Sequence, residues 1–290
     1  MDVHEGIDHR ARVSALVRQL IDEHDPKYGV GSITCSVYDT AWVAMIPKTI
    51  HGQTKWLFPA SFQYLLVSQR HDGGWHDSPV GVDGILNTLA ALLAVCKHVA
   101  APYQISSISK EDLQQRQTRA VYYLEAKFAE WDVSTTQPNG FELLVPKLLQ
   151  LLAQEGVDFC VSGKDLLMDL RNKTAFKFHP STLYNKQRTS AAQCLEGLIG
   201  DLNFDKISQH KISGSMMASP ASTAAYLIHS STWDDEAESY LSHIISVFDE
   251  KYGGVPSRYP STVSEVTGVS AECKSGITTM LTSIRLFQSC

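Results

Sequence analysis

The residues with the clearest chemical potential form an acidic run, Asp234-Asp235-Glu236-Ala237-Glu238. Its DDxxE pattern can hold Mg²⁺ against a diphosphate, because carboxylate oxygens are the ligands that Mg²⁺ prefers. The same run follows three hydroxyl residues, 230–232, at the start of a predicted helix, where acidic side chains are favoured by the helix dipole. We therefore interpret it as a helix start and keep the metal site as the less favoured alternative.

Other residues capable of catalysis are dispersed along the chain. The sequence contains no HExxH pair, no GxSxG and no phosphate-binding glycine loop, which leaves a hydrolase or nucleotide-binding function without support. Asp72 and His76 lie beside a Gly-Gly turn, and we assign them to the turn rather than to catalysis. The histidines we weighed as metal ligands lack paired spacing: His71, His76, His98, His179, His210 and His229.

Composition limits the remaining possibilities. The chain has 290 residues, 43% hydrophobic and 19% charged, enough for one large globular domain or two ordinary ones. A net charge of −6 without a basic run argues against a nucleic-acid partner. The six cysteines include no CxxC pair, which favours a reducing compartment and a cytoplasmic location and argues against zinc. The longest apolar run we identify, residues 85–94, is too short to span a bilayer.

Two short stretches should position the rest of the chain. In residues 36–45 (SVYDTAWVAM), we predict Asp39 as the N-cap of a buried helix and Trp42 as part of the core. In residues 69–75 (QRHDGGW), Gln69 can bond free backbone groups at a helix end, and Gly73 permits a tight reversal. Trp75 can then pack over the turn, so this stretch should tie one helical hairpin to the next.

Hydrophobic periodicity predicts an all-α fold built from helical hairpins, since no alternating strand pattern persists. An amphipathic helix is expected at 8–24, a polar turn at 48–55, and a faint repeat of glycine-containing loops at 73–75, 213–216 and 253–256. The helix predicted at 140–154 contains Pro146, which we consider as its first helical residue. The other predicted helices are 61–69, 83–98, 111–130, 140–154, 166–173, 189–197, 222–229 and 234–248, with a short one possible at 278–287.

Seven motifs in order resemble the N-terminal half of class II diterpene cyclases, closest to fungal enzymes of the copalyl diphosphate synthase and ent-kaurene synthase type. The resemblance covers roughly residues 8–265. Besides 36–45 and 69–75, the motifs are ILNTLAALLAV (85–95), PNGFELLVPKLL (138–149), CLEGL (194–198), GSMMASPASTAAYL (214–227) and YGGVPSRYPS (252–261).

The resemblance implies two α-helical barrels, called β and γ, with γ inserted after the first helix of β. Residues 1–34 would be that first β helix, 35–255 the γ α/α-barrel, and 256–290 a truncated, divergent return into β. The family binds geranylgeranyl diphosphate between the barrels, in reactions associated with Mg²⁺. The middle Asp of a DXDD motif protonates the terminal alkene to give a copalyl-type diphosphate, which a buried, protonated carboxyl can do.

The chain departs from the family pattern at its functional positions. No DXDD occurs in residues 1–290, so we expect the chain alone to be inactive as a class II cyclase. Where plant relatives place a His-Asn base, this chain has Gln193 and Tyr252, which become candidates to line the cleft. The acidic Mg²⁺-associated motif is reduced to Glu130 and Asp132, which remain the candidates for a metal there.

Three interpretations remain open from the sequence. The chain is a truncated diterpene cyclase, or a non-catalytic module that binds an isoprenoid or a full-length cyclase. The third interpretation is an incomplete gene model of a bifunctional enzyme with isomerase and lyase activities. Sequencing the transcript across the codons for residues 255–290 separates the third from the first.

Overall fold

The computed structural model describes residues 9–31, 33–76, 81–103, 108–137, 140–177, 180–185, 189–248 and 253–262. The chain divides into two compact units. We call residues 34–257 the barrel unit, and residues 1–33 with 258–290 the terminal unit.

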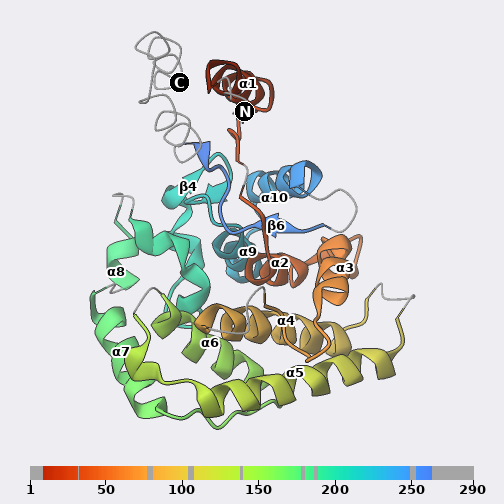
Figure 1. Ribbon diagram of the computed structural model, residues 1–290, viewed down its shortest axis with the longest axis vertical. Helices are drawn as coiled ribbons and strands as arrows, with labels where there is room; N and C mark the ends of the chain where they lie inside the picture. The colour runs from red at the N-terminus through yellow and green to blue at the C-terminus, as the bar shows by residue number, and fades with distance from the viewer. Residues whose placement is uncertain are drawn as a thin grey trace, which may run out of the picture. The chain divides into compact units, whose positions relative to one another are not determined.

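The described part of the barrel unit is predominantly helical (Figure 1). Its three two-stranded ladders are short: β1 (Cys35–Ser36) pairs with β6 (Val255–Pro256), β2 (Pro47–Ile50) with β3 (Gln53–Trp56), and β4 (Lys211–Ile212) with β5 (Ser215–Met216), all antiparallel. The α-helices are α2 (Val37–Ala44), α3 (Pro59–Ser68), α4 (Val82–Ala100), α5 (Lys110–Glu130), α6 (Phe141–Gln154), α7 (Lys164–Lys177), α8 (Pro180–Leu183), α9 (Pro220–His229) and α10 (Asp235–Phe248). Short 3₁₀ turns are η1 (Val133–Thr135), η2 (Ser190–Gln193), η3 (Leu195–Leu198), η4 (Phe204–Lys206) and η5 (Ser208–His210).

The helices of the barrel unit form an inner ring with a second layer outside it (Figure 1). Going around the inner ring, α2 packs on α4, α4 on α6, α6 on η3, η3 on α9, and α9 again on α2. Outside this ring, α3 packs on α2, α5 on α4, α7 on α6, and α10 on α9. Each of the four inner α-helices thus has an outer partner helix. This arrangement is the α/α-barrel of helical hairpins predicted from the sequence.

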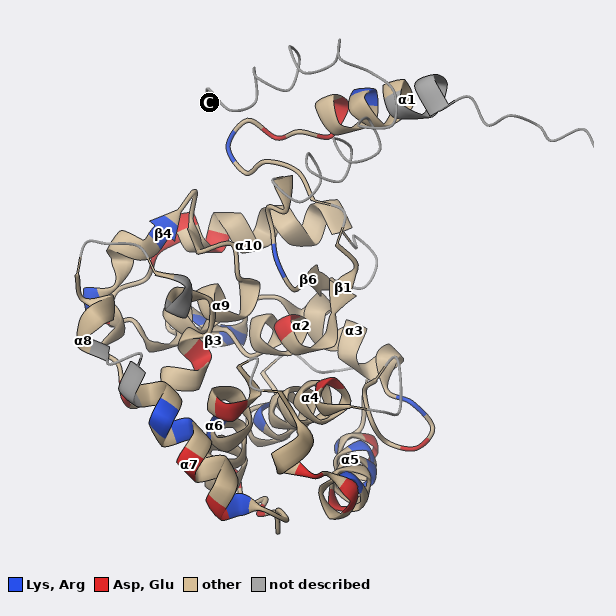
Figure 2. Cartoon of the chain, turned by 60° about the vertical axis from the view of Figure 1, so that its left-hand side comes forward, with Lys and Arg blue, Asp and Glu red and all other residues tan. Residues whose placement is uncertain are grey.

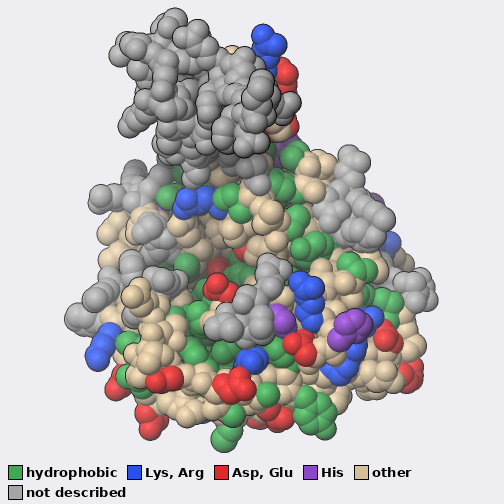
Figure 3. Space-filling view, viewed as in Figure 1, with side chains coloured by type: hydrophobic (Ala, Val, Ile, Leu, Met, Phe, Trp, Pro, Cys, Tyr) green, Lys and Arg blue, Asp and Glu red, His purple; other side chains and the backbone are tan. Residues whose placement is uncertain are grey.

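Hydrophobic patterning explains which helices are inside. α4 is buried on nearly every side, including Leu89, Leu92 and Leu93, as expected for a helix that is apolar all round. It is also the one helix among the described residues that is long and apolar enough to cross a bilayer, but 67% of its apolar window is buried within the fold. The outer helices α5 and α7 instead carry many charged residues (Figure 2), and acidic and basic side chains are intermixed on the face in Figure 3.

The predicted polar turn at 48–55 is wrong, because this segment forms a β-hairpin from Pro47 to Trp56. His51 and Gly52 have φ of +51° and +78°, which is the left-handed pair that a two-residue hairpin loop requires. A hydroxyl pair, Thr49 and Thr54 at 2.9 Å, joins the two strands.

Two predicted helices also differ from expectation, one in where it begins and one in its type. α6 begins at Phe141, so Pro146 lies inside the helix rather than at its start. The predicted helix at 189–197 is two 3₁₀ turns, η2 and η3, separated at Cys194. Gly197 accounts for the close packing of η3 on α6, because a Cβ at this position would lie 3.2 Å from the Cβ of Leu143.

The terminal unit contains α1 (His9–Asp22), in agreement with the predicted amphipathic helix. Ile21 of this helix is 48% exposed. Two distant segments meet in this unit: the amide of Ser261 donates to the carbonyl of Val30, and the hydroxyl of Tyr259 donates to the carbonyl of Gly29, both at 3.0 Å. The possible helix at 278–287 lies outside the described residues.

A buried histidine joins the hairpin to the barrel core. The ring of His98 is stacked between Trp56 and Phe62, with centroid distances of 4.2 and 3.6 Å. Its Nε2 donates to the carbonyl of Ala44 at 2.9 Å, while Nδ1 is buried and has no partner among the described residues. Burial lowers the pKa of His98 to about 4, so the ring is neutral in the folded protein near pH 7.

This histidine should make the fold sensitive to acid. The unfolded chain protonates His98 near pH 6.5 and the folded chain near pH 4, so its contribution to stability is lost as pH falls through this window. The variant His98→Gln cannot protonate there. Relative to this variant, the wild-type free energy of unfolding should fall by about 1 kcal/mol between pH 6 and pH 5. Urea titrations at the two pH values measure this difference, and parallel curves for both proteins would contradict it.

Candidate functional site

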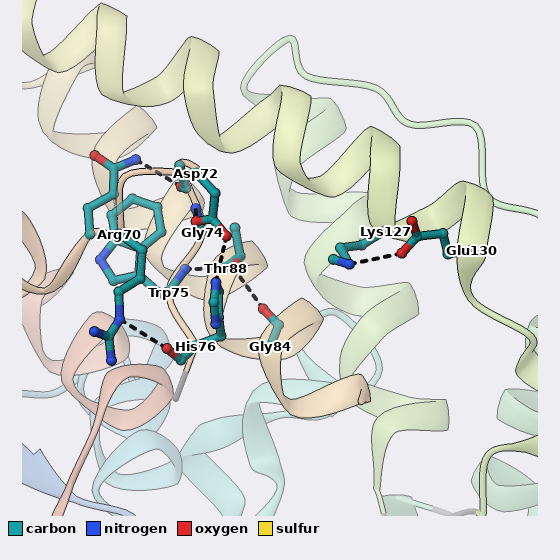
Figure 4. Close-up of polar contacts among 11 residues, drawn as sticks. Arg70, Asp72, Gly74, Trp75, His76, Gly84, Thr88, Lys127 and Glu130 are labelled. Atoms are coloured by element: carbon teal, nitrogen blue, oxygen red, sulfur yellow. Dashed lines mark hydrogen bonds and ion pairs between the residues drawn. The ribbon is translucent and has the colours of Figure 1, made fainter. Parts of the chain in front are cut away.

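The Gln-Trp turn, residues 69–76, forms the staple predicted from its sequence (Figure 4). The side-chain amide of Gln69, just after α3, donates to the carbonyls of Gly73 at 2.9 Å and Arg116 at 3.1 Å. Asp72 accepts from the amide of Gly74 at 3.0 Å and from the ring of His76 at 2.8 Å. Asp72 and His76 therefore hold the turn together, in agreement with their assignment to structure.

Trp75 connects the turn to helices on both sides. It is fully buried, and its indole N–H donates to the carbonyl of Leu65 at 2.7 Å. Leu65 is one of the last four residues of α3, whose carbonyls have no partner within the helix. The amide of Trp75 donates to the hydroxyl of Thr88 in α4 at 3.0 Å (Figure 4). Trp75 thus satisfies one carbonyl at the end of α3 and fixes the position of α4.

Gly73 is required for the turn to lie against α5. Its φ is +95°, and a Cβ at this position would overlap the backbone carbonyl of Arg119. We expect Gly73→Ala to lower the free energy of unfolding by about 2 kcal/mol, from left-handed strain plus this collision. Gly52 is a matched control with φ of +78°, and a Cβ added there would have no atom within 4 Å, so Gly52→Ala should cost only about 1 kcal/mol. Equal losses in urea unfolding would show that the contact with Arg119 is unimportant.

The start of α2 differs in detail from the prediction. Ser36, not Asp39, is the N-cap: its side chain accepts from the amide of Asp39 at 3.2 Å, and the helix begins at Val37. Asp39 is the third helical residue, and its Oδ2 accepts from the hydroxyl of Ser36 at 2.8 Å. The two residues form a reciprocal pair at the helix start, with Asp39 in the position that Glu or Gln takes in a capping box. Trp42 is 3% exposed and belongs to the core, as predicted.

Asp39 and Glu196 form a buried acid pair where three elements of the inner ring meet. Asp39 Oδ1 accepts from the amide of Ala221 in α9 at 3.2 Å. Glu196 in η3 accepts from the hydroxyl of Ser222 in α9 at 2.8 Å and from that of Tyr38 in α2 at 3.1 Å. The carboxyls therefore join α2, η3 and α9 at the point where the ring closes.

Burial strongly perturbs this acid pair. Loss of solvation raises the pKa of Asp39 to about 8 and that of Glu196 to about 7, and the charge of Glu196 adds to the effect on Asp39. Both side chains are at most 5% exposed. Because their oxygens face protein donors, the pair is suited to closing the ring and not to donating a proton to a substrate.

Gln193 lies beside a strained loop that sequence reasoning missed. Its amide donates to the carbonyl of Met217 at 3.2 Å, and Met217 and Ala218 have φ of +50° and +64°. Two consecutive non-glycine residues in the left-handed region are costly, and such strain is concentrated at functional sites. Met217, Ala218 and Gln193 are all partly accessible. Tyr252, the other predicted cleft residue, lies outside the described residues.

The two metal candidates, Glu130 and Asp132, contact donors of the protein itself. Glu130 is paired with Lys127 at 2.8 Å (Figure 4), and Asp132 accepts from the amide and hydroxyl of Ser134. Both acids line a cavity of about 690 Å³ together with Asp83. Nevertheless, the described residues contain no group of three or more His, Cys, Asp or Glu side chains arranged to hold an ion. In this structure both carboxylates are engaged by donors of the protein itself.

The DDxxE run caps a helix, as interpreted from the sequence. Asp234 Oδ1 accepts from the amides of Glu236 and Ala237 at 3.1 Å, and its Oδ2 pairs with Lys211 at 2.6 Å. Glu238 pairs with Lys48 and accepts from the indole of Trp233 at 2.6 Å. These carboxylates are thus compensated by cations and donors of the protein itself.

Comparison with known proteins relates this barrel to terpene cyclases. No protein-family model matches the chain. It is 46% identical over 260 residues to "Copalyl diphosphate synthase" of Talaromyces verruculosus, covering 89% of this chain and 27% of the relative. It is 45% identical over 270 residues to "Ent-kaur-16-ene synthase" of Phaeosphaeria sp. (strain L487), covering 91% of this chain and 28% of that relative. The chain thus spans about a quarter of the length of the curated relatives that it matches.

Solved structures agree on the fold. The ent-copalyl diphosphate synthase of Arabidopsis thaliana, in complex with (S)-15-aza-14,15-dihydrogeranylgeranyl thiolodiphosphate, matches with a TM-score of 0.67 and 21% identity, over 92% of this chain and 38% of that one. The abietadiene synthase from Abies grandis matches with a TM-score of 0.65 and 22% identity, over 92% and 36%. Over about nine-tenths of its length, this chain is homologous to fungal diterpene cyclases of the copalyl diphosphate synthase and ent-kaurene synthase type.

Proposed function

We propose that the barrel unit serves as the inserted γ barrel of a protonation-initiated diterpene cyclase and shapes one side of its substrate cavity. The observation that carries this proposal is the 46% identity to a copalyl diphosphate synthase over 260 residues. The closed ring of α2, α4, α6, η3 and α9 supports it, because a closed helical ring is a rigid scaffold. On this proposal, geranylgeranyl diphosphate is the substrate and a copalyl-type diphosphate the product.

On the same proposal, residues 1–290 contribute scaffold and not the acid. A buried carboxyl that protonates an alkene must also reach the substrate, whereas Asp39 and Glu196 are enclosed and hydrogen-bonded. The strained Met217–Ala218 loop with Gln193 is the part of the barrel unit that we assign to the cavity wall. No step is assigned to Mg²⁺, since Glu130 and Asp132 are each engaged by donors of the protein itself.

Incubation of the purified chain with geranylgeranyl diphosphate and Mg²⁺ tests this division of roles. We expect no copalyl-type diphosphate, because no DXDD occurs in residues 1–290. The authentic Talaromyces enzyme in the same assay is the positive control. A copalyl-type product formed by this chain would show that it holds a competent acid and would overturn the assignment of scaffold alone.

A further inference from the structure

A cavity lies between α6 and α7, and none of the residues that line it has been assigned to the candidate functional site. It measures about 510 Å³, within the range of small-molecule sites. The α6 wall includes Leu149, the α7 wall includes Met168, and the connecting loop contributes Phe159. Met168 is 38% exposed, and Leu149 and Phe159 are partly exposed, so an apolar surface remains accessible inside the cavity.

The cavity also holds a buried cation. Lys147 lies in the apolar run of α6 and is only 4% exposed. Its ammonium donates to the carbonyl of Ile199 at 2.5 Å and to the side-chain oxygen of Gln150 at 2.7 Å. Of its three N–H bonds, two are thus used, and within the described part of the chain no carboxylate pairs with it. Burial lowers the pKa of Lys147, and the charge of Arg171 adds to this effect while that of Asp201 opposes it.

The other charges around the cavity leave it favourable to an anion. Arg171 and Asp201 neutralise each other in an ion pair of 2.6 Å. Lys164 and Asp158, both exposed, are the remaining charged lining residues. The lining thus carries three cations against two carboxylates, and Lys147 is the buried member of this cationic excess. A buried ammonium without a counter-ion is costly, and an anion in the cavity would reduce that cost.

We propose that this cavity binds an amphipathic anion, with a carboxylate or phosphate head at Lys147 and an aliphatic chain along Leu149, Phe159 and Met168. Fatty acids and isoprenyl monophosphates share this chemistry. The site is independent of the proposed cyclase function. It uses neither the residues that close the ring nor Gln193, Met217 and Ala218, which we assign to the wall of the substrate cavity.

Isothermal titration with decanoate and with geranyl monophosphate, each below its micellar concentration, tests the proposal. We expect one molecule of at least one of them to bind per chain, and the better ligand identifies the head group. Inorganic phosphate should not compete at the same concentration, because it lacks the aliphatic part. Failure of both amphiphiles to bind, or equally tight binding of inorganic phosphate, would overturn the proposal.

Two variants locate the site. Lys147→Met keeps the unbranched apolar part of the side chain and removes its charge, so the dissociation constant should rise roughly tenfold to a hundredfold. Met168→Glu places an acid at an exposed position and should weaken binding by about tenfold or more without disturbing the core. Lys173→Met removes a charge from an exposed position of α7 outside the cavity and is the matched control. Wild-type affinity in Met168→Glu would exclude this cavity as the site, even if Lys147→Met fails to fold.

Discussion

Replacing Trp75 by alanine should lower the free energy of unfolding by about 3–5 kcal/mol, the range for fully buried large aromatic residues. The change leaves a cavity under the Gln-Trp turn. It also removes the indole donor from the carbonyl of Leu65, leaving the end of α3 without that bond. Urea unfolding at pH 7, followed by circular dichroism at 222 nm, measures the loss. A loss of this size is a large fraction of the total stability of an ordinary domain.

Two further variants separate the causes of this loss. Trp75→Phe keeps most of the packing but cannot donate a hydrogen bond. The free energy of unfolding of Trp75→Phe should therefore be about 1–2 kcal/mol higher than that of Trp75→Ala. Tyr122→Ala changes an aromatic residue on α5 that is 67% exposed and should change stability by less than about 0.5 kcal/mol. If Trp75→Ala proved no more harmful than Tyr122→Ala, the turn could not be the staple described above.

Replacing Asp39 by asparagine should remove a large part of the pH dependence of stability. The pKa of Asp39 is about 8 in the folded chain and near 3.8 when unfolded, so the folded state binds an extra proton between these values. Its contribution to stability is complete below pH 3.8 and is lost as pH rises towards 8. From pH 5 to pH 7, wild type should lose about 3 kcal/mol relative to Asp39→Asn, or about 1.4 kcal/mol per pH unit.

The relative measurement matters because His98 acts in the opposite direction over part of the same range. His98 is present in both proteins, so its effect cancels in the difference. Asparagine imitates the protonated carboxyl: its oxygen can accept from Ala221, and its amide can donate to Ser36 Oγ, which accepts instead of donating when residue 39 carries the proton. Asp39→Ala provides neither bond and should be less stable than Asp39→Asn at every pH. Wild-type and Asp39→Asn stabilities that change in parallel between pH 5 and pH 7 would show that Asp39 is ionised in the fold.

Local patterns in the sequence predicted much of this fold. The apolar periodicity of 83–98 and 111–130 indicated helices whose observed bounds, Val82–Ala100 and Lys110–Glu130, differ by two residues or fewer. The roles of Gln69, Gly73 and Trp75 followed from the hydrogen-bonding capacity of glutamine, the freedom of glycine and the size of tryptophan. These properties act over a few residues, which is why a sequence pattern can show them.

The features that were missed depend on residues far apart in the chain. Asp39 and Glu196 are separated by more than 150 positions, and only ring closure brings η3 and α9 to the start of α2. Lys147 stands in an apolar run that reads as core, and its cavity depends on the placement of α7. The hairpin at 47–56 did carry a local signal, a two-residue His-Gly loop, but its polar strands lack the alternation that marks a buried face.

Segment exchange tests the central claim most directly. The 260 residues of the Talaromyces copalyl diphosphate synthase that align with this chain would be replaced by the corresponding residues of this chain. Product is measured by mass spectrometry after incubation with geranylgeranyl diphosphate and dephosphorylation. If the barrel unit is a cyclase barrel, the exchanged enzyme should form a copalyl-type diphosphate, and Trp75→Ala within it should abolish or sharply reduce that product. A soluble, cooperatively folded exchanged enzyme that forms no cyclised product, alongside an active parent, would contradict the claim.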